Sequence, residues 1–221
     1  MNEFGQLLQK TTIKFAKTGP AIFHSHHDMI RFWERAVKRA ELPLRLTQGF
    51  NPRPRIIFPH ALGLGITSRH EEVELELCEE MDVDELLRRV VAAAGDTLDI
   101  QSARNLPPVK QSRQLVASFY RIDGWSDEAL AKLPAACAEL LAKEEIVVER
   151  GAPGKRRSLD IRPYIVSLEC RPEERVLLAQ LSHSTSGAAR PDEIAKLTAE
   201  RTGVDYHTLA IEKTAMVLES V

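Results

Sequence analysis

Basic side chains gather between residues 25 and 55 in a pattern that suits the binding of anions. From position 31 to position 55 there are seven basic residues and two acidic ones. Four of the basic residues fall at spacings that place them on one side of a predicted helix: Arg31, Arg35, Lys38 and Arg39. Like charges four residues apart on a helix cost a few tenths of a kcal/mol, which favours a role such as phosphate contact. A solvated helix face explains the ridge equally well.

The loop GFNPRPR, Gly49–Arg55, is predicted to be stiff. Gly49 permits a positive φ, while Pro52 and Pro54 hold their own φ at about −65° and favour extended conformations in the residues before them. A stiff loop loses little entropy on binding, so it suits the recognition of an anion or a base edge. A structural turn between strands is the alternative. The side chains that the loop would present are Asn51, Arg53 and Arg55.

Three histidines lie beside Asp28 at the predicted start of the helix: His24, His26 and His27. They are weak candidates for a metal site, because the spacing is neither that of a zinc finger nor that of HExxH. A helix N-terminus lowers the pKa of a histidine, which makes His26 the candidate for a general base or acid. Two other interpretations stay open, namely surface histidines and contact with RNA or another ligand.

A second basic segment, Arg150–Arg162, has the sequence RGAPGKRRSLDIR, with five basic residues and one acidic residue. Its glycines and its proline predict the tip of a hairpin. A basic tip is typical of contacts with the nucleic-acid backbone that do not depend on sequence. A solvent-exposed hairpin that binds nothing would have the same composition. The candidate residues are Lys155, Arg156 and Arg157.

Composition excludes several classes of function. The net charge is −2 over 221 residues, so any basic surface is local. We find neither an apolar stretch of about 20 residues, the length that spans a bilayer, nor a secretion signal. Three widely spaced cysteines indicate a reduced, cytosolic protein. The motifs GxxxxGK[ST], GxGxxG, GxSxG and CxxxCxxC are absent, so we expect no cofactor in this chain and no radical initiation by it alone.

The first half of the chain carries an α+β pattern. Ser25 and Asp28 form a predicted capping box, and helical spacing of apolar residues continues to Glu41. A second helix is expected over 82–95. The buried stripe of the first helix should consist of Met29, Trp33, Ala36, Val37 and Ala40. Alternating residues predict antiparallel strands at 13–15, 56–58, 73–77 and 98–102.

The second half repeats this order of elements. The polar segment Asn105–Gln114, with its pair of prolines, is predicted to be a linker. Strands follow at 116–122, 146–149, 161–170, 176–181 and 209–218, with helices from Ser126 and from Pro191. We therefore predict an α+β protein of two tandem ferredoxin-like (βαββαβ-type) sandwiches with antiparallel sheets. The expected domains are 1–106, with the SHxD helix and the GFNPxP loop, and 107–221, with the basic hairpin tip.

The run from Phe15 to Leu77 resembles the family of radical-SAM-linked hypothetical proteins, a domain of unknown function fused to, or encoded beside, a radical SAM protein. The matching pieces are FAKTGPA from Phe15, SHxD from Ser25, R-x₃-RA-x₂-RA from Arg31, GFNPxP from Gly49, and ALxLG from Ala61 with Glu71 after it. In the second half, KRRSLDIRPYI from Lys155 and RPxE from Arg190 extend the resemblance. Arg53 stands where the family pattern has a histidine, which leaves a catalytic role of that position in doubt.

The resemblance implies a bacterial cytosolic protein whose partner, a separate radical SAM protein, carries an iron–sulfur cluster and S-adenosylmethionine. It implies no activity for this chain, and the genomic neighbours of the family lean toward RNA processing. We expect an accessory subunit, not an enzyme on its own, that binds RNA or tRNA for modification or processing. One alternative is a metal-independent endoribonuclease that uses His26. Another is a protein-interaction module that docks its partner through the acidic stretch Glu71–Glu85 or the basic helix.

Overall fold

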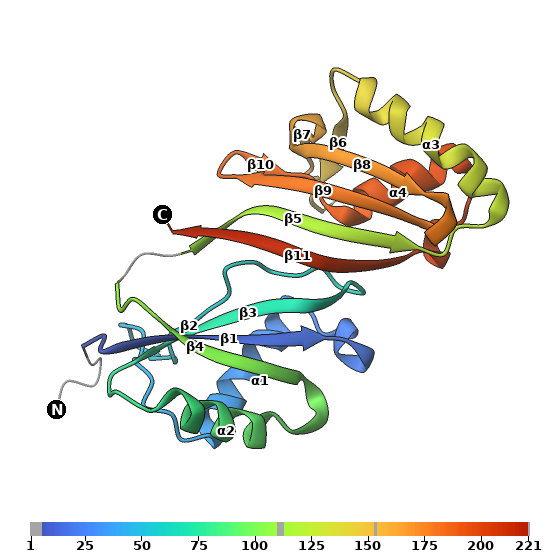
Figure 1. Cartoon of the computed structure of the whole chain (residues 1–221). Coiled ribbons are helices and arrows are strands. Elements are labelled where there is room, and N and C mark those ends of the chain that lie inside the picture. The colour runs from blue at the N-terminus through green and yellow to red at the C-terminus, as the bar shows by residue number, and fades with distance from the viewer. Residues whose placement is uncertain (1–5, 110–112, 153, 221) are drawn as a thin grey trace. The chain divides into compact units, whose positions relative to one another are not determined.

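The computed structural model describes residues 6–109, 113–152 and 154–220 (Figure 1). These residues form a mixed α+β protein with four α-helices and mostly antiparallel strands. Two compact units are present: unit 1 holds the described residues up to Gln114 together with Ser220, and unit 2 holds Leu115–Glu219. Over the part of the chain that the structure describes, no helix is long and apolar enough to cross a membrane.

The sheet of unit 1 has the strand order β4-β1-β3-β2. Its strands are β1 (Gln9–Lys17), β2 (Ile56–Ile57), β3 (Thr67–Leu77) and β4 (Asp99–Leu106). All three pairings are antiparallel. The alternation of side chains along β1 and β3 sends Ile13, Phe15, Val73 and Leu75 into the apolar core. Polar and charged residues of the same strands point to the opposite face.

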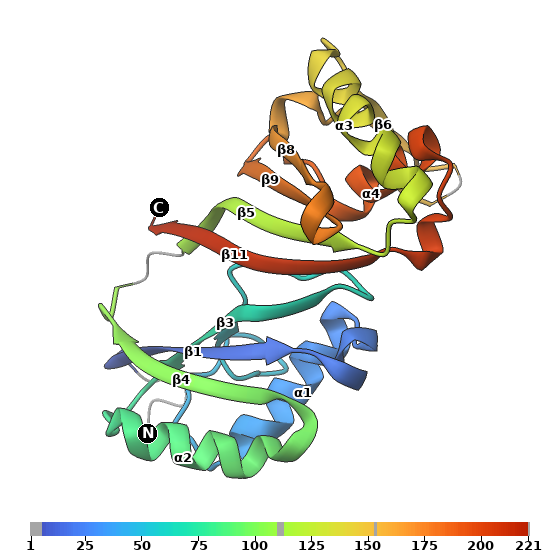
Figure 2. The same ribbon diagram turned by 45° about the vertical axis from the view of Figure 1, so that its right-hand side comes forward.

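Two helices cover the apolar face of this sheet, as Figures 1 and 2 show: α1 (His26–Arg39) and α2 (Val83–Ala94). The predicted capping box of α1 is confirmed. The Asp28 N–H donates to the Ser25 hydroxyl at 3.2 Å, and the Ser25 N–H donates to the Asp28 carboxylate at 3.0 Å. The predicted stripe is also confirmed, since all five of its members are buried. Within it, Trp33 meets Phe15 edge-on at 5.3 Å between ring centroids.

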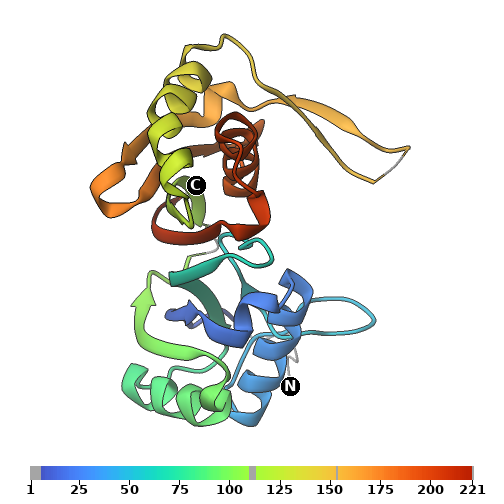
Figure 3. The same cartoon turned by 90° about the vertical axis from the view of Figure 1, so that its right-hand side faces the viewer.

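Unit 2 also contains antiparallel strands: β5 lies between β9 and β11, and β9 also pairs with β8 and β10. Its strands are β5 (Arg113–Asp123), β8 (Ile165–Arg171), β9 (Val176–Ser184), β10 (Gly187–Ala188) and β11 (Ala210–Ser220). Its helices, α3 (Asp127–Ala142) and α4 (Pro191–Thr202), pack against each other. A separate hairpin of β6 (Val147–Arg150) and β7 (Arg157–Asp160) extends from the unit (Figure 3).

Some sequence-based boundaries are wrong. The predicted linker overlaps two strands, because β4 continues to Leu106 and β5 begins at Arg113; residues 110–112 lie outside the described part. Asn105 belongs to β4 because it pairs with Thr11 of β1, and its side chain also accepts a hydrogen bond from the Gln9 amide at 2.9 Å. The strand expected from Ile161 begins at 165, since Pro163 lacks an N–H and sits in a short 3₁₀ turn.

Candidate functional site

A groove of about 580 Å³ lies in unit 1 between α1 and the segment that leads from α1 to β2. Its floor is apolar and is made by Val37, Leu42, Leu44 and Leu46. Its rim is charged and carries Glu34, Arg35, Lys38, Glu41 and Arg53. Such a floor accepts an apolar ring, while rim cations attract an anion. The groove therefore suits a ligand with one flat apolar part and one anionic part.

The residues beyond the groove floor fold into a hairpin. The Thr47 N–H donates to the Arg53 carbonyl, and the Arg55 N–H donates to the Arg45 carbonyl, both at 2.8 Å. The Thr47 hydroxyl also accepts from the Arg53 N–H at 3.0 Å. Gly49 has a φ of +139°, the positive value expected from its sequence. These bonds and the two prolines stiffen the hairpin, which extends away from the rest of unit 1 in Figure 3 (light blue).

Phe50 stands at the tip of this hairpin and is fully exposed, at 105% of its reference area. Its neighbours Asn51 and Arg53 are exposed as well. An aromatic ring without contacts to the fold contributes nothing to the core, but it offers a flat surface on which a base can stack. The sequence reasoning missed Phe50. The available signal was an aromatic residue inside a Gly/Asn/Pro turn with basic residues on its C-terminal side.

The predicted ridge on α1 is shorter than expected. Arg31 and Arg35 are exposed, and Arg35 lines the groove with Lys38. Arg39 instead turns toward α2 and donates to the Ala93 carbonyl at 2.5 Å. The backbone position of Arg39 is still on the ridge, about 40° around the helix from Arg35, so the Ala93 carbonyl and not the helix geometry sets the direction of its guanidinium. Arg39 therefore ties the two helices together.

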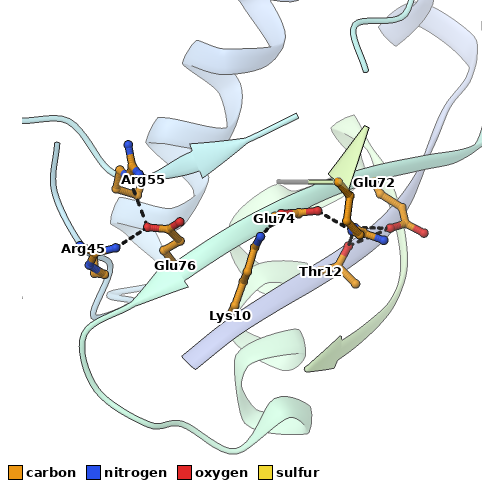
Figure 4. A network of polar contacts seen from close by, with 8 residues as sticks. Lys10, Thr12, Arg45, Arg55, Glu72, Glu74 and Glu76 are labelled. Atoms are coloured by element: carbon orange, nitrogen blue, oxygen red, sulfur yellow. Dashed lines mark hydrogen bonds and ion pairs between the residues drawn. The ribbon is translucent and has the colours of Figure 1, made fainter. Parts of the chain in front are cut away.

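Arg55 likewise has a partner inside unit 1. Figure 4 shows the Glu76 carboxylate between Arg45, at 2.6 Å, and Arg55, at 3.2 Å. Arg53 differs, because its side chain is 70% exposed. Its ion pair with Glu34 is long, at 3.7 Å, and a surface pair of this kind contributes little to stability. Of the two loop arginines, Arg53 is therefore the one available to a ligand.

The acidic stretch on β3 is engaged in the same way (Figure 4). Glu74 lies 2.7 Å from the Lys10 ammonium and 2.5 Å from the Arg113 guanidinium. Arg113 also meets Glu72 at 2.6 Å. These carboxylates are neutralised within the unit and form part of its polar sheet face.

A second cavity of unit 1, of about 20 Å³, lies beneath the N-terminus of α1 and has room for about one water molecule. Apolar and titratable side chains line it: Phe15, Met29, Phe58, Leu62, Lys17, His26, His60 and Glu71. The His26 ring meets Phe58 edge-on at 5.5 Å between centroids. Burial, and secondarily the charge of His27, lower the pKa of His26, which favours the neutral form of its imidazole. The segments FAKTGPA, SHxD and Glu71 thus meet here, which the sequence alone did not indicate.

The other two histidines of the cluster lie outside this cavity. His24 is half-buried and its Nδ1 has no hydrogen-bond partner within the described structure, while His27 is exposed. Among the residues that the structure describes, no three His, Cys, Asp or Glu side chains are grouped in a way that could hold a metal ion.

The basic tip of unit 2 presents Lys155, Arg156 and Arg157 as exposed side chains. Arg150 is held in place, with two hydrogen bonds of 2.6 and 2.7 Å to the Glu193 carboxylate. A cavity of about 460 Å³ adjoins this hairpin, and its charged lining residues are all basic: Arg150, Lys155, Arg157 and Arg190. This arrangement can receive an anionic group.

Comparison with known proteins gives one family. A search of curated proteins finds no match. Among solved structures, the chain is similar to the crystal structure of an unknown protein from Galdieria sulphuraria, with 13% identity over 96% of this chain and 98% of that one. The TM-score of 0.27 is too low to support a conclusion about fold. The model of one bacterial family, in contrast, matches residues 10–191. The chain therefore belongs to the family described as "uncharacterized protein conserved in bacteria (DUF2344)".

Proposed function

We propose that this protein binds single-stranded RNA along the groove and hairpin of unit 1. One observation carries the proposal: Phe50 is fully exposed at the tip of a hydrogen-bonded hairpin whose base borders a groove with three basic and two acidic side chains on its rim. Recognition of single strands combines stacking of bases on aromatic rings with a positive groove that follows the backbone. In this arrangement Phe50 stacks a base, Asn51 offers hydrogen bonds, and Arg35 and Arg53 contact phosphates.

We propose that unit 2 adds contacts with RNA that do not depend on the base sequence of the RNA. Its exposed tip residues Lys155, Arg156 and Arg157 carry three positive charges beside the basic cavity. Contacts of this kind raise affinity for any phosphate backbone and weaken as salt rises. We assign base recognition to unit 1 and contacts with the phosphate backbone to both units.

We further propose that each unit is a ferredoxin-like sandwich. The strand order β4-β1-β3-β2 of unit 1 supports this, as does the corresponding order β11-β5-β9-β8 of unit 2. In unit 2 the β6–β7 hairpin is then an insertion between α3 and β8. The fold alone assigns no function.

The proposed role is that of an accessory subunit that presents RNA to a separate radical SAM enzyme in modification or processing. The support is the motif resemblance over Phe15–Leu77, together with a chain that has no CxxxCxxC triplet of its own. The iron–sulfur cluster and S-adenosylmethionine would belong to that partner. A role restricted to protein docking has less support, because Glu72, Glu74 and Glu76 of the acidic stretch are neutralised within unit 1.

Fluorescence anisotropy with an unstructured RNA oligonucleotide, titrated at several salt concentrations, tests the proposal. Each of Arg35→Ala, Lys38→Ala and Arg53→Ala should weaken binding and reduce the slope of log K against log salt by about 0.7 per lost phosphate contact. Arg88→Ala is the matched control, because Arg88 is an exposed arginine of the same unit on α2. Equal affinities of the wild type and all three groove variants would refute RNA binding at this groove.

A further inference from the structure

Four titratable side chains from four separate segments line the small cavity beneath α1: Lys17, His26, His60 and Glu71. We propose that they form a metal-independent acid–base site that cleaves a phosphodiester bond of the bound RNA. This inference rests on the proposed binding of RNA and adds an activity to it.

The position of the cluster in the sheet is unusual for charged groups. On β1, Lys17 continues the row of Ile13 and Phe15. On β3, Glu71 continues the row of Val73. Both rows face the apolar core. Lys17 is only 2% exposed and Glu71 only 5%. Burial of charged groups is costly unless they are compensated, and such groups concentrate at functional sites. The pairing register of β1 with β3 also shifts between Phe15 and Lys17, and irregularities of this kind are common beside active sites.

The site lies within reach of a strand that occupies the groove. His26 lines the small cavity and Val37 lines the groove, and a separation of 11 residues places both on the same side of α1. The helical rise of 1.5 Å per residue puts them about 16 Å apart along the axis. RNA that leaves the groove toward the N-terminus of α1 would therefore reach His26 within a few nucleotides. Arg35 and Arg53 line the groove and not this cavity, so they are assigned to binding.

The groups present suit transesterification of RNA. The 2′-oxygen attacks phosphorus while the bond from phosphorus to O5′ breaks, which gives a 2′,3′-cyclic phosphate and a 5′-hydroxyl. His26 takes the proton of the 2′-hydroxyl as general base, and His60 gives a proton to the departing O5′ as general acid. The bonds and protons of this reaction balance without a metal ion or any other reactant.

Lys17 and Glu71 act from beneath the phosphate. The cavity is too small for a phosphate, so the scissile group sits at its mouth, where His26 and His60 are half-buried. The Lys17 ammonium donates a hydrogen bond to the Gly63 carbonyl at 3.3 Å, which fixes positive charge on the cavity wall. That charge stabilises the anionic transition state, while Glu71 compensates it in the absence of RNA.

Cleavage of a 5′-labelled, unstructured RNA in EDTA tests this site. The wild type should give fragments that end in a 2′,3′-cyclic phosphate, and 2′-deoxy substitution at the cleaved position should abolish them. His26→Gln and His60→Gln should each lower the cleavage rate about 100-fold or more, with RNA affinity unchanged by anisotropy. His207→Gln, an exposed histidine of unit 2 that is prepared in the same way, is the matched control for contaminating nuclease and should cleave within a few-fold of the wild type.

The outcomes separate the inference from the proposed function. Wild-type protein that binds RNA but does not cleave it would overturn the acid–base site and leave RNA binding intact. Equal cleavage by the wild type and by His26→Gln would also overturn it, since the activity would then come from elsewhere. If circular dichroism shows that the glutamine variants have lost their fold, two other measurements decide the question. The 2′-deoxy substrate should stay uncleaved, and Lys17→Arg, which keeps the positive charge, should still cleave RNA. A wild type that binds no RNA would overturn both.

Discussion

Replacing Phe50 with alanine should weaken RNA binding strongly and leave the fold unchanged. The ring is fully exposed, so its removal takes no apolar surface out of the core. Stacking of a base on an aromatic side chain contributes about 1–3 kcal/mol, which corresponds to a loss of affinity of about 5- to 150-fold. Substitutions at exposed positions usually change the free energy of unfolding by less than about 0.5 kcal/mol, so urea denaturation should give the same midpoint for both proteins.

Anisotropy titrations of Phe50→Ala and Phe50→Trp against one oligonucleotide measure this effect. The tryptophan variant keeps an aromatic surface and should bind at least as well as the wild type. Because Phe50 carries no charge, neither substitution should alter the salt slope. An affinity of Phe50→Ala within twofold of the wild type would refute the stacking role. A loss shared by the tryptophan variant would indicate a requirement for shape, which contradicts stacking as well.

Two further predictions concern stability. Glu76→Ala should lower the free energy of unfolding by about 2–3 kcal/mol, less than for a fully buried pair because Arg55 is 43% exposed; an unchanged urea midpoint would contradict the role of Glu76. Burial, and secondarily Lys213, lower the pKa of His183 in the folded protein to about 4. In the unfolded chain the same histidine binds a proton at about pH 6.5. The free energy of unfolding should therefore fall as the pH drops from 6.5 to 4, by about 3 kcal/mol, and His183→Asn should remove this fall. Identical pH dependence of the wild type and His183→Asn would show that His183 is not the cause.

Local rules predicted the parts of this structure that depend on neighbours in sequence. The capping box of Ser25 and Asp28 needs only three residues, and the alternation of Val73 and Leu75 needs only one strand. Both features are present as expected. The stiff Gly49–Arg55 hairpin also follows from local chemistry, since its proline and glycine positions restrict the backbone directly.

Features that depend on tertiary neighbours could not be predicted. The direction of Arg39 is set by a carbonyl of α2, and that of Arg55 by Glu76 on β3. The cavity that joins Lys17, His60 and Glu71 exists only because β1, β3 and the segment after β2 meet beneath α1. Sequence spacing carries no information about such meetings. The charges that were predicted to bind ligand thus divide into those that hold the fold and those that stay exposed.

Hydrogen–deuterium exchange with and without a saturating RNA oligonucleotide tests the central claim that the groove and hairpin of unit 1 bind RNA. Backbone N–H groups of residues 42–56 and of α1 should exchange more slowly with RNA, because the ligand covers the hairpin and the groove rim. Those of α2, whose residues do not line the groove, should be unaffected. Bound RNA that leaves exchange in residues 42–56 unchanged would contradict the account.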